Sequence, residues 1–222
     1  MWQVLFEGLK ERNFTILAVA MDAREGAARP WIEAAKPSYP CLIDRHHRVA
    51  ELYNMVNVPQ AVWIDEAGKF VRPAESAGAY EGFRQMDRKT FKMPEEAAVL
   101  TRQAKQTYAD AVRDWVLHDR ASAHAFDREQ AKAHLNLPDE SVARAHARFR
   151  LGQHLLGRGD EAQAAEQFAE ARRLHPDSWN IWRQTHPVDS RGLASGPEFW
   201  ARVDALGARR YYAPVDMKGM PG

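Results

Sequence analysis

The chain has a single cysteine, Cys41, among its 222 residues. An internal disulfide requires two thiols, and structural thiolate metal sites use several, so both are excluded. A redox reaction at Cys41 would have to take its resolving thiol from another molecule. We therefore expect the redox or binding partner to be a separate protein that carries a thiol or a disulfide.

The chain also lacks an excess of charge and a long apolar run. Lys and Arg total 31, Asp and Glu total 30, and the net charge is +1. Such a balance creates no global field that attracts nucleic acid or anionic membranes. No uncharged run reaches the 18 residues of a membrane span, and the N-terminus lacks the basic and apolar parts of a signal peptide. We expect a cytoplasmic protein that binds neither nucleic acid nor membrane.

Several motifs of cofactor and metal chemistry are missing. There is no glycine-rich phosphate loop and no Gly-x-Ser-x-Gly elbow. None of the nine histidines belongs to a His-Glu-x-x-His pair, and His146 and His154 are too far apart for one helical turn. We therefore predict no cofactor and no metal ligands, and we expect the histidines at exposed or capping positions.

The first 71 residues alternate short helices with short apolar strands. Trp2, Leu5, Phe6 and Leu9 form one helical stripe, and residues 15–20 form an apolar run that predicts a strand buried on both faces. Alternation of this kind is typical of an α/β sheet. The further elements that we expect are a helix over 26–36, a strand over 39–44, a helix over 47–53, a strand over 61–64, a hairpin loop over 65–68 and a returning strand over 69–71.

The rest of the chain predicts helices. Residues 72–94 show little periodicity and suggest a linker, and the segment 94–117 has the pattern of one long amphipathic helix. Helical patterns continue to Gly207, interrupted by turns near Pro138, 157–159, Pro176 and Pro187. We expect an α/β domain over residues 1–90 and an all-helical domain over 91–222.

Three short motifs in the first part together indicate a known family. They are the strand 15–20 followed by Asp22, the run Cys41-Leu42-Ile43-Asp44, and Ala50–Tyr53 leading through Val58-Pro59 to the segment 63–68. Residues 1–71 with these motifs resemble thioredoxin-like proteins of the TlpA/ResA-type redoxin family, which is related to the AhpC/TSA peroxiredoxins. The resemblance implies antioxidant-type thiol–disulfide oxidoreductase chemistry. It also implies a cis Val58–Pro59 bond and a loop of Val58, Pro59 and Gln60 that binds an extended substrate segment.

The thiols of that family are missing from their expected place. The family motif Trp-Cys-x-x-Cys precedes the first helix, whereas Met1 and Trp2 already lie within that helix. We therefore predict that this chain alone is inactive as a disulfide reductase. Cys41 aligns with a buried strand residue and is interpreted as a structural core thiol. The alternative is a reactive Cys41 whose pKa is lowered by Arg45, His46 and His47.

The resemblance also implies a missing central strand between 15–20 and 61–64. Neighbouring strands lie about 4.8 Å apart, and each unsatisfied buried backbone group costs on the order of 1–3 kcal/mol. Three outcomes follow: the flanking strands close on each other, another chain supplies a strand by self-association through the exposed sheet, or the chain is a fragment. We favour an N-terminally truncated chain with a misplaced start codon.

Residues 145–178 resemble a single tetratricopeptide repeat. Leu151-Gly152, Ala164, Phe168, Ala171 and Pro176 occupy consensus positions, and the two small residues would let a pair of helices approach closely. One repeat indicates a packed helical hairpin. The alternative is a peptide-binding groove lined by Arg172, Arg173 and His175. The competing function is thus a non-catalytic interaction module, in which the thioredoxin scaffold and these helices bind a partner protein.

Overall fold

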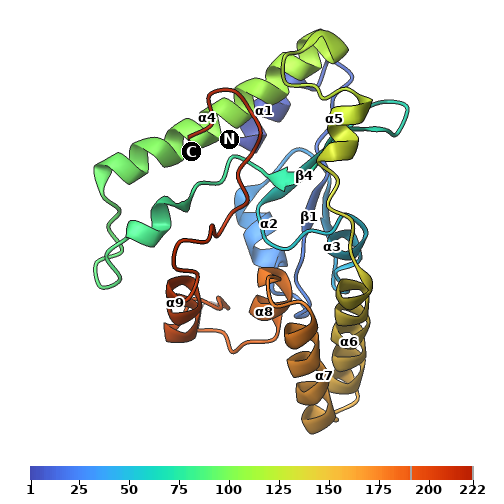
Figure 1. Ribbon diagram of the computed structural model, residues 1–222, viewed down its shortest axis with the longest axis vertical. Helices are drawn as coiled ribbons and strands as arrows, with labels where there is room; N and C mark the ends of the chain where they lie inside the picture. Colours follow the sequence, from blue (N-terminus) through green and yellow to red (C-terminus); the bar gives the residue numbers. More distant parts are fainter. Residues whose placement is uncertain (191, 222) are drawn as a thin grey trace. The chain divides into compact units, whose positions relative to one another are not determined.

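The computed structural model describes residues 1–190 and 192–221 and divides into two compact units. The first unit consists of Met1–Ile16, Pro59–Leu135 and Pro197–Gly222, and the second consists of Leu17–Val58 and Asn136–Gly196. Each unit is therefore assembled from segments far apart in the sequence, as the colours of Figure 1 show. The compact units alternate along the chain. The domain boundary that the sequence predicts near residue 90 stays a prediction.

The first unit combines an antiparallel hairpin with helices. Its hairpin pairs β3 with β4, and its longest element is the 24-residue helix α4 (Figure 1). The predicted first helix, the long helix after Pro94 and the hairpin loop over 65–68 are confirmed. The elements of this unit are α1 (Trp2–Leu9), β3 (Gln60–Ile64), β4 (Phe70–Ser76), the 3-10 helix η1 (Glu81–Gln85), α4 (Glu95–His118), the 3-10 helix η2 (Asp119–Ala121), α5 (Arg128–Ala133) and α9 (Pro197–Asp204).

The core of the first unit forms where α1, α4 and the hairpin meet. Leu5 and Leu9 supply the buried face of α1, as the helical stripe predicts. Trp63 of β3 stacks on Trp115 of α4 with 5.1 Å between ring centroids, and its indole N–H donates to the Tyr108 hydroxyl. The hairpin is therefore covered by a large apolar surface, which is the usual source of stability for a short antiparallel sheet.

The strand β4 is longer than the sequence indicates. The prediction of a linker from residue 72 is wrong for residues 72–76, which continue the strand to Ser76. The ladder is irregular between the pairs Trp63↔Arg72 and Ala61↔Glu75, with two residues of β4, Pro73 and Ala74, set against one of β3. Pro73 lies within this bulge, where a missing N–H donor interrupts no regular ladder bond. The sequence did not predict this extension, because a proline such as Pro73 usually ends a strand.

A buried ion pair joins β4 to the rest of the first unit. The fully buried guanidinium of Arg72 donates to both carboxylate oxygens of Glu75 and to the carbonyls of His124 and Asp216. The hydroxyl of Tyr108 donates to the same Glu75 carboxylate. This network holds a C-terminal segment and the loop before α5 against the hairpin.

The second unit combines a parallel strand pair with helices. In β1 and β2, Ala18 pairs with Cys41, Val19 with Leu42, and Ala20 with Ile43, and α2 is the crossover between them. Pro30 lies in the first turn of α2, where its lack of an N–H is tolerated. The elements of this unit are β1 (Ala18–Ala20), α2 (Arg29–Ala35), β2 (Cys41–Ile43), α3 (Arg48–Leu52), α6 (Glu140–Gly157), α7 (Glu161–Leu174) and α8 (Trp179–Gln184).

The helices α6 and α7 form a closely packed hairpin. A Cβ atom on Gly152 would lie 2.6 Å from the ring of Phe168 and 3.2 Å from the carbonyl oxygen of Ala164, so the close approach expected at these residues is confirmed. Helix α7 ends at Leu174, just before Pro176. The hairpin is a structural observation, whereas its identity as a tetratricopeptide repeat stays a prediction.

The strands are less buried than the sequence predicts. In the part of the chain that the structure describes, β1 pairs with β2 and β3 pairs with β4, in two separate sheets of two strands. Closure of the first strand on the third is thus not observed. All three residues of β1 are only partly buried, and Leu42 of β2 is 53% exposed. The prediction of a strand buried on both faces is wrong, because α2 contributes no buried residue to cover the parallel pair.

Candidate functional site

Cys41 is the first residue of β2, and its thiol is unpaired and partly exposed. Cys41 is thus less buried than its interpretation as a structural core thiol implies, and whether this thiol is structural or reactive stays a prediction. The pKa of the nearby Tyr39 hydroxyl is raised, first by burial and then by its proximity to Cys41. Because Cys41 is partly exposed, a reagent can reach it. The sequence did not predict this exposure.

Two of the residues predicted to activate Cys41, Arg45 and His47, lie in surroundings that do not suit that role. The ring of His47 is fully buried, and burial lowers its pKa from 6.5 to about 4. His47 is thus uncharged at neutral pH and cannot stabilise a thiolate. The guanidinium of Arg45 lies 3.8 Å from the carboxylate of Glu25. The burial of His47 and the pairing of Arg45 with Glu25 do not favour activation of Cys41 by these two residues.

The predicted partner-binding loop spans the junction of the two units. Cys41 and Val58 belong to the second unit, while Pro59 and Gln60 belong to the first. The backbone N–H of Val58 donates to the side chain of Asn57 at 2.9 Å, and the carbonyl of Pro59 accepts from Ala77 at 3.1 Å. The side chains of Val58 and Pro59 are exposed, and Gln60 begins β3. The loop therefore exposes two apolar side chains, while part of its backbone is already hydrogen-bonded.

Sequence reasoning missed a cluster of buried histidines in the second unit. His47, His146 and His175 are all buried. His47 and His175 stand at helix caps, as expected, whereas His146 lies within α6, contrary to the expectation of exposed or capping positions. The ring of His47 packs on Phe149 at 4.9 Å, and the rings of His146 and His175 lie 6.2 Å apart between centroids. Neither ring nitrogen of His47 has a hydrogen-bond partner, and Nδ1 of His146 also lacks one. No spacing in the sequence could have revealed the cluster, since its members come from three separate elements.

Burial determines the protonation of this cluster. It lowers the pKa of His146 to about 4, against the opposing influence of the Glu51 carboxylate, and it lowers the pKa of His175 as well. The rings are therefore neutral near pH 7. Across the described residues, no group of three or more His, Cys, Asp or Glu side chains has the geometry of a metal site.

The residues predicted to line a peptide groove are engaged within the second unit. Arg172 donates to the hydroxyl of Thr185 at 2.8 Å, and Arg173 forms a two-pronged pair with Glu170. His175 belongs to the buried cluster. These contacts favour a packed hairpin over a groove at this end of α7.

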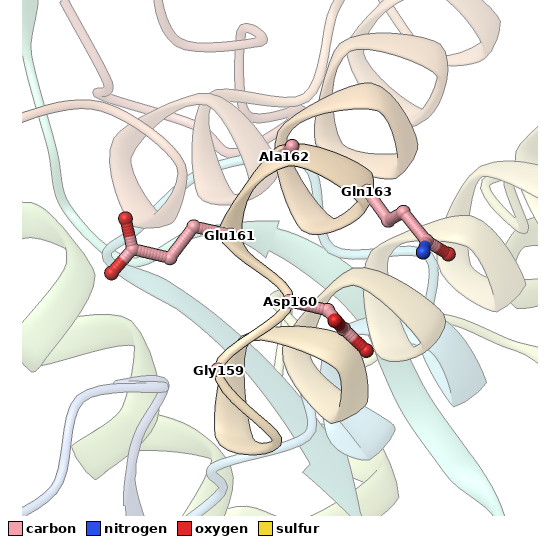
Figure 2. Close-up of a pocket in the computed structure, with 5 residues that line it drawn as sticks. All are labelled: Gly159, Asp160, Glu161, Ala162 and Gln163. Atoms are coloured by element: carbon pink, nitrogen blue, oxygen red, sulfur yellow. The ribbon is translucent and has the colours of Figure 1, made fainter.

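A shallow hollow lies at the start of α7, lined by residues 159–163. Figure 2 shows the side chains of Asp160, Glu161 and Gln163 pointing in different directions rather than toward one point. The two carboxylates also oppose the binding of an anion at this helix N-terminus. The hollow therefore has no features of a ligand site.

Comparison with known proteins finds a similarity in the first part of the chain. Residues 2–72 match the model of the AhpC/TSA family, which covers less than half of the chain. No curated protein and no solved structure matches the chain. In the described residues, no helix is long and apolar enough to cross a membrane. The segment 2–72 is thus similar to the AhpC/TSA family, and a mostly helical region follows it.

Proposed function

We propose that this chain uses a redoxin scaffold related to thiol–disulfide oxidoreductases and does not complete a reductase cycle by itself. The observation that carries the proposal is Cys41, which is the only thiol and lies on β2 rather than before the first helix. In thiol–disulfide exchange, a thiolate attacks a disulfide sulfur and expels one thiolate, which leaves a mixed disulfide. A second thiol must then attack that mixed disulfide to release the reduced product. With Cys41 alone, the reaction stops at the mixed disulfide.

Insulin reduction tests this proposal. The chain is reduced beforehand and freed of the reductant, because added dithiothreitol would itself resolve a mixed disulfide, and the precipitation of reduced insulin is followed by turbidity. We expect the same negligible rate with the native chain, with Cys41→Ser and with insulin alone. A faster rate with the native chain that is lost in Cys41→Ser would contradict the proposal and would assign the activity to Cys41.

A thiol titration examines the first half of the exchange. Because Cys41 is partly exposed, we expect a disulfide reagent to react with the native chain and to leave one mixed disulfide per molecule. The same titration in denaturant gives the rate for a fully exposed thiol. A native thiol that reacts only after unfolding would show that Cys41 takes no part in exchange.

The second candidate function is protein binding without catalysis. The exposed side chains of Val58 and Pro59 favour it, and Val58 is 41% exposed. A suitable probe is the reduced and carboxymethylated B chain of insulin, which is extended and cannot exchange disulfides. We expect Val58→Asp to weaken binding of this probe. The matched control is Val99→Asp, at a valine of α4 that is 46% exposed.

The binding experiment separates the two candidates. Equal affinity of the two aspartate variants for the probe would exclude the Val58–Gln60 segment as the binding surface. Because the probe contains no free thiol and no disulfide, its binding does not depend on Cys41. The reductase assay and the binding assay can therefore fail independently.

A further inference from the structure

Four aromatic side chains of the first unit lie in contact with one another. Trp63 of β3 stacks on Trp115 of α4 with 5.1 Å between ring centroids, and it meets the ring of Tyr108 edge-on at 5.8 Å. The ring of Trp2, from α1, lies 6.1 Å from that of Tyr108. Aromatic rings whose centroids are about 4.5–7 Å apart are in direct contact. The four rings therefore form a continuous path, named here the aromatic cluster, of Trp2, Trp63, Tyr108 and Trp115.

The aromatic cluster leads from the surface of the first unit into its core. Trp2 and Trp115 are partly exposed, whereas Trp63 is buried and Tyr108 is fully buried. A molecule in solution can therefore meet the two outer indoles directly. It can exchange electrons with Tyr108 only through the rings that surround that side chain.

The buried hydroxyl of Tyr108 has a proton acceptor in place. It accepts from the indole N–H of Trp63 at 2.9 Å and donates to Oε1 of Glu75 at 3.0 Å. Both oxygens of Glu75 also accept from Arg72, so the carboxylate is in its acceptor form. Burial, and then the charge of Glu75, raise the pKa of the Tyr108 hydroxyl well above its ordinary value. Tyr108 thus keeps its proton in the resting protein, hydrogen-bonded to a base.

This arrangement suits the one-electron oxidation of a tyrosine. A phenol that loses an electron becomes a strong acid, so its oxidation is favourable where a base accepts the proton at the same time. A base does so when it lies within hydrogen-bond reach of that proton, as Glu75 does. An oxidised tryptophan takes an electron from such a tyrosine, because the neutral tyrosine radical is the more stable product. An oxidising equivalent that enters at an outer indole therefore moves toward Tyr108.

We propose that the aromatic cluster traps strong one-electron oxidants, of the class of the carbonate radical anion, by transferring the oxidising equivalent to Tyr108. The radical anion takes one electron from an outer indole and leaves as carbonate. Tyr108 then gives one electron to that indole, directly in the case of Trp2 and through Trp63 in the case of Trp115. The O–H bond of Tyr108 breaks, and its proton binds to Oε1 of Glu75. The products are a neutral Tyr108 radical and a protonated Glu75, and the indoles are restored.

Pulse radiolysis of a bicarbonate solution generates the carbonate radical anion and tests the transfer. The full chain is used with Cys41→Ser, because the thiol is a competing electron donor, so the outcome does not depend on the reductase assay. Tryptophan and tyrosine radicals have distinct visible absorption bands. We expect the tryptophan band to decay as the tyrosine band grows.

A substitution at Tyr108 identifies the end of the path. In Tyr108→Phe, the growth of the tyrosine band that accompanies tryptophan decay should be lost, and the tryptophan radical should live longer. The matched control is Tyr80→Phe, at a partly buried tyrosine of the same unit that lies outside the aromatic cluster. This control should behave as the parent chain does.

A second measurement examines the proton and needs no further substitution. Because the O–H bond of Tyr108 breaks during the transfer, the tyrosine band should grow more slowly in deuterated water. Glu75→Gln should also slow this growth, since an amide is a far weaker base than a carboxylate, and circular dichroism checks that the variant is folded. Equal rates of growth in the two solvents would overturn the proposal. So would a tyrosine band that still grows with tryptophan decay in Tyr108→Phe.

Discussion

The two strand pairs of this protein differ in how they are covered. The pair β3–β4 is an antiparallel hairpin, and Trp63, Tyr108 and the buried Arg72–Glu75 pair fix it to the core of the first unit. The pair β1–β2 is parallel, only three residues long in each strand, and leaves Leu42 mostly exposed. The segment 2–72 that matches the AhpC/TSA family thus contains the whole of the poorly covered pair, but only β3 and the first three residues of β4 from the well-covered pair.

The difference shows what each type of sheet requires. An antiparallel hairpin needs only a tight turn and one apolar face, and Asp65 provides the turn by accepting from the N–H groups of Ala67 and Lys69. A parallel pair needs a crossover and cover on both faces. The crossover α2 is present, but it buries none of its residues. The stability of the second unit therefore depends on the packing of its helical hairpin and of the histidine cluster instead.

Acid should produce the largest difference between the units. His47 and His146 have folded-state pKa values of about 4, against 6.5 when unfolded. The unfolded state therefore binds more protons between pH 6.5 and 4, so the free energy of unfolding falls as the pH falls through this range and levels off below it. Each ring accounts for about 3 kcal/mol. Amide hydrogen exchange of α6 and α7 at a series of pH values measures this loss in the free energy of unfolding.

The acid effect has a clear control. His118 lies on the surface, bonded to Asp114 at 2.9 Å, and His118→Gln should leave the pH profile of α6 and α7 unchanged. His47→Leu should make that profile shallower, since the variant loses one of the two titrating rings. Equal acid sensitivity of the two units in the native chain would contradict the assignment to the histidine cluster.

Removing the Arg72 side chain should weaken the well-covered strand pair. Arg72→Met leaves the Glu75 carboxylate without its partner and frees the carbonyls of His124 and Asp216. Breaking a buried pair in this way typically costs about 3–5 kcal/mol. Urea unfolding followed by tryptophan fluorescence measures the change. Arg113→Met removes an exposed pair with Asp110 and should cost less than about 1 kcal/mol.

A smaller effect is expected in the helical hairpin of the second unit. Gly152→Ala places a Cβ atom against the ring of Phe168 at 2.6 Å, so the helices must shift, at a cost of about 1–3 kcal/mol. Gly157→Ala, near the end of the same helix, meets nothing within 4 Å and should stabilise the helix by about 0.5–1 kcal/mol. Thermal unfolding of the two variants should shift in opposite directions. A shift in the same direction would show that the close approach at Gly152 does not limit packing.

The sequence predicted the elements whose signals are local. The stripe of Leu5 and Leu9, the long helix after Pro94 and the turn at Asp65 depend on nearby residues, and all three are present. The extension of β4 through Pro73 and the burial of His47 depend on contacts between distant segments, which periodicity does not encode. For the candidate site, the sequence identified Cys41 and Val58–Gln60. It did not predict the partial exposure of Cys41 or the hydrogen bond from the Val58 N–H to the side chain of Asn57.

The alternation of the two units along the chain has a consequence for how the protein is made. The core of the first unit includes Leu5 from the first segment and Met217 from the last. During synthesis, this core cannot close until Met217 has left the ribosome, whereas the last segment of the second unit ends at Gly196. Premature termination after Gly196 would therefore deprive the first unit of a core residue while the second unit keeps all of its segments. A nascent chain of that length should expose the apolar surface of α4 to chaperones.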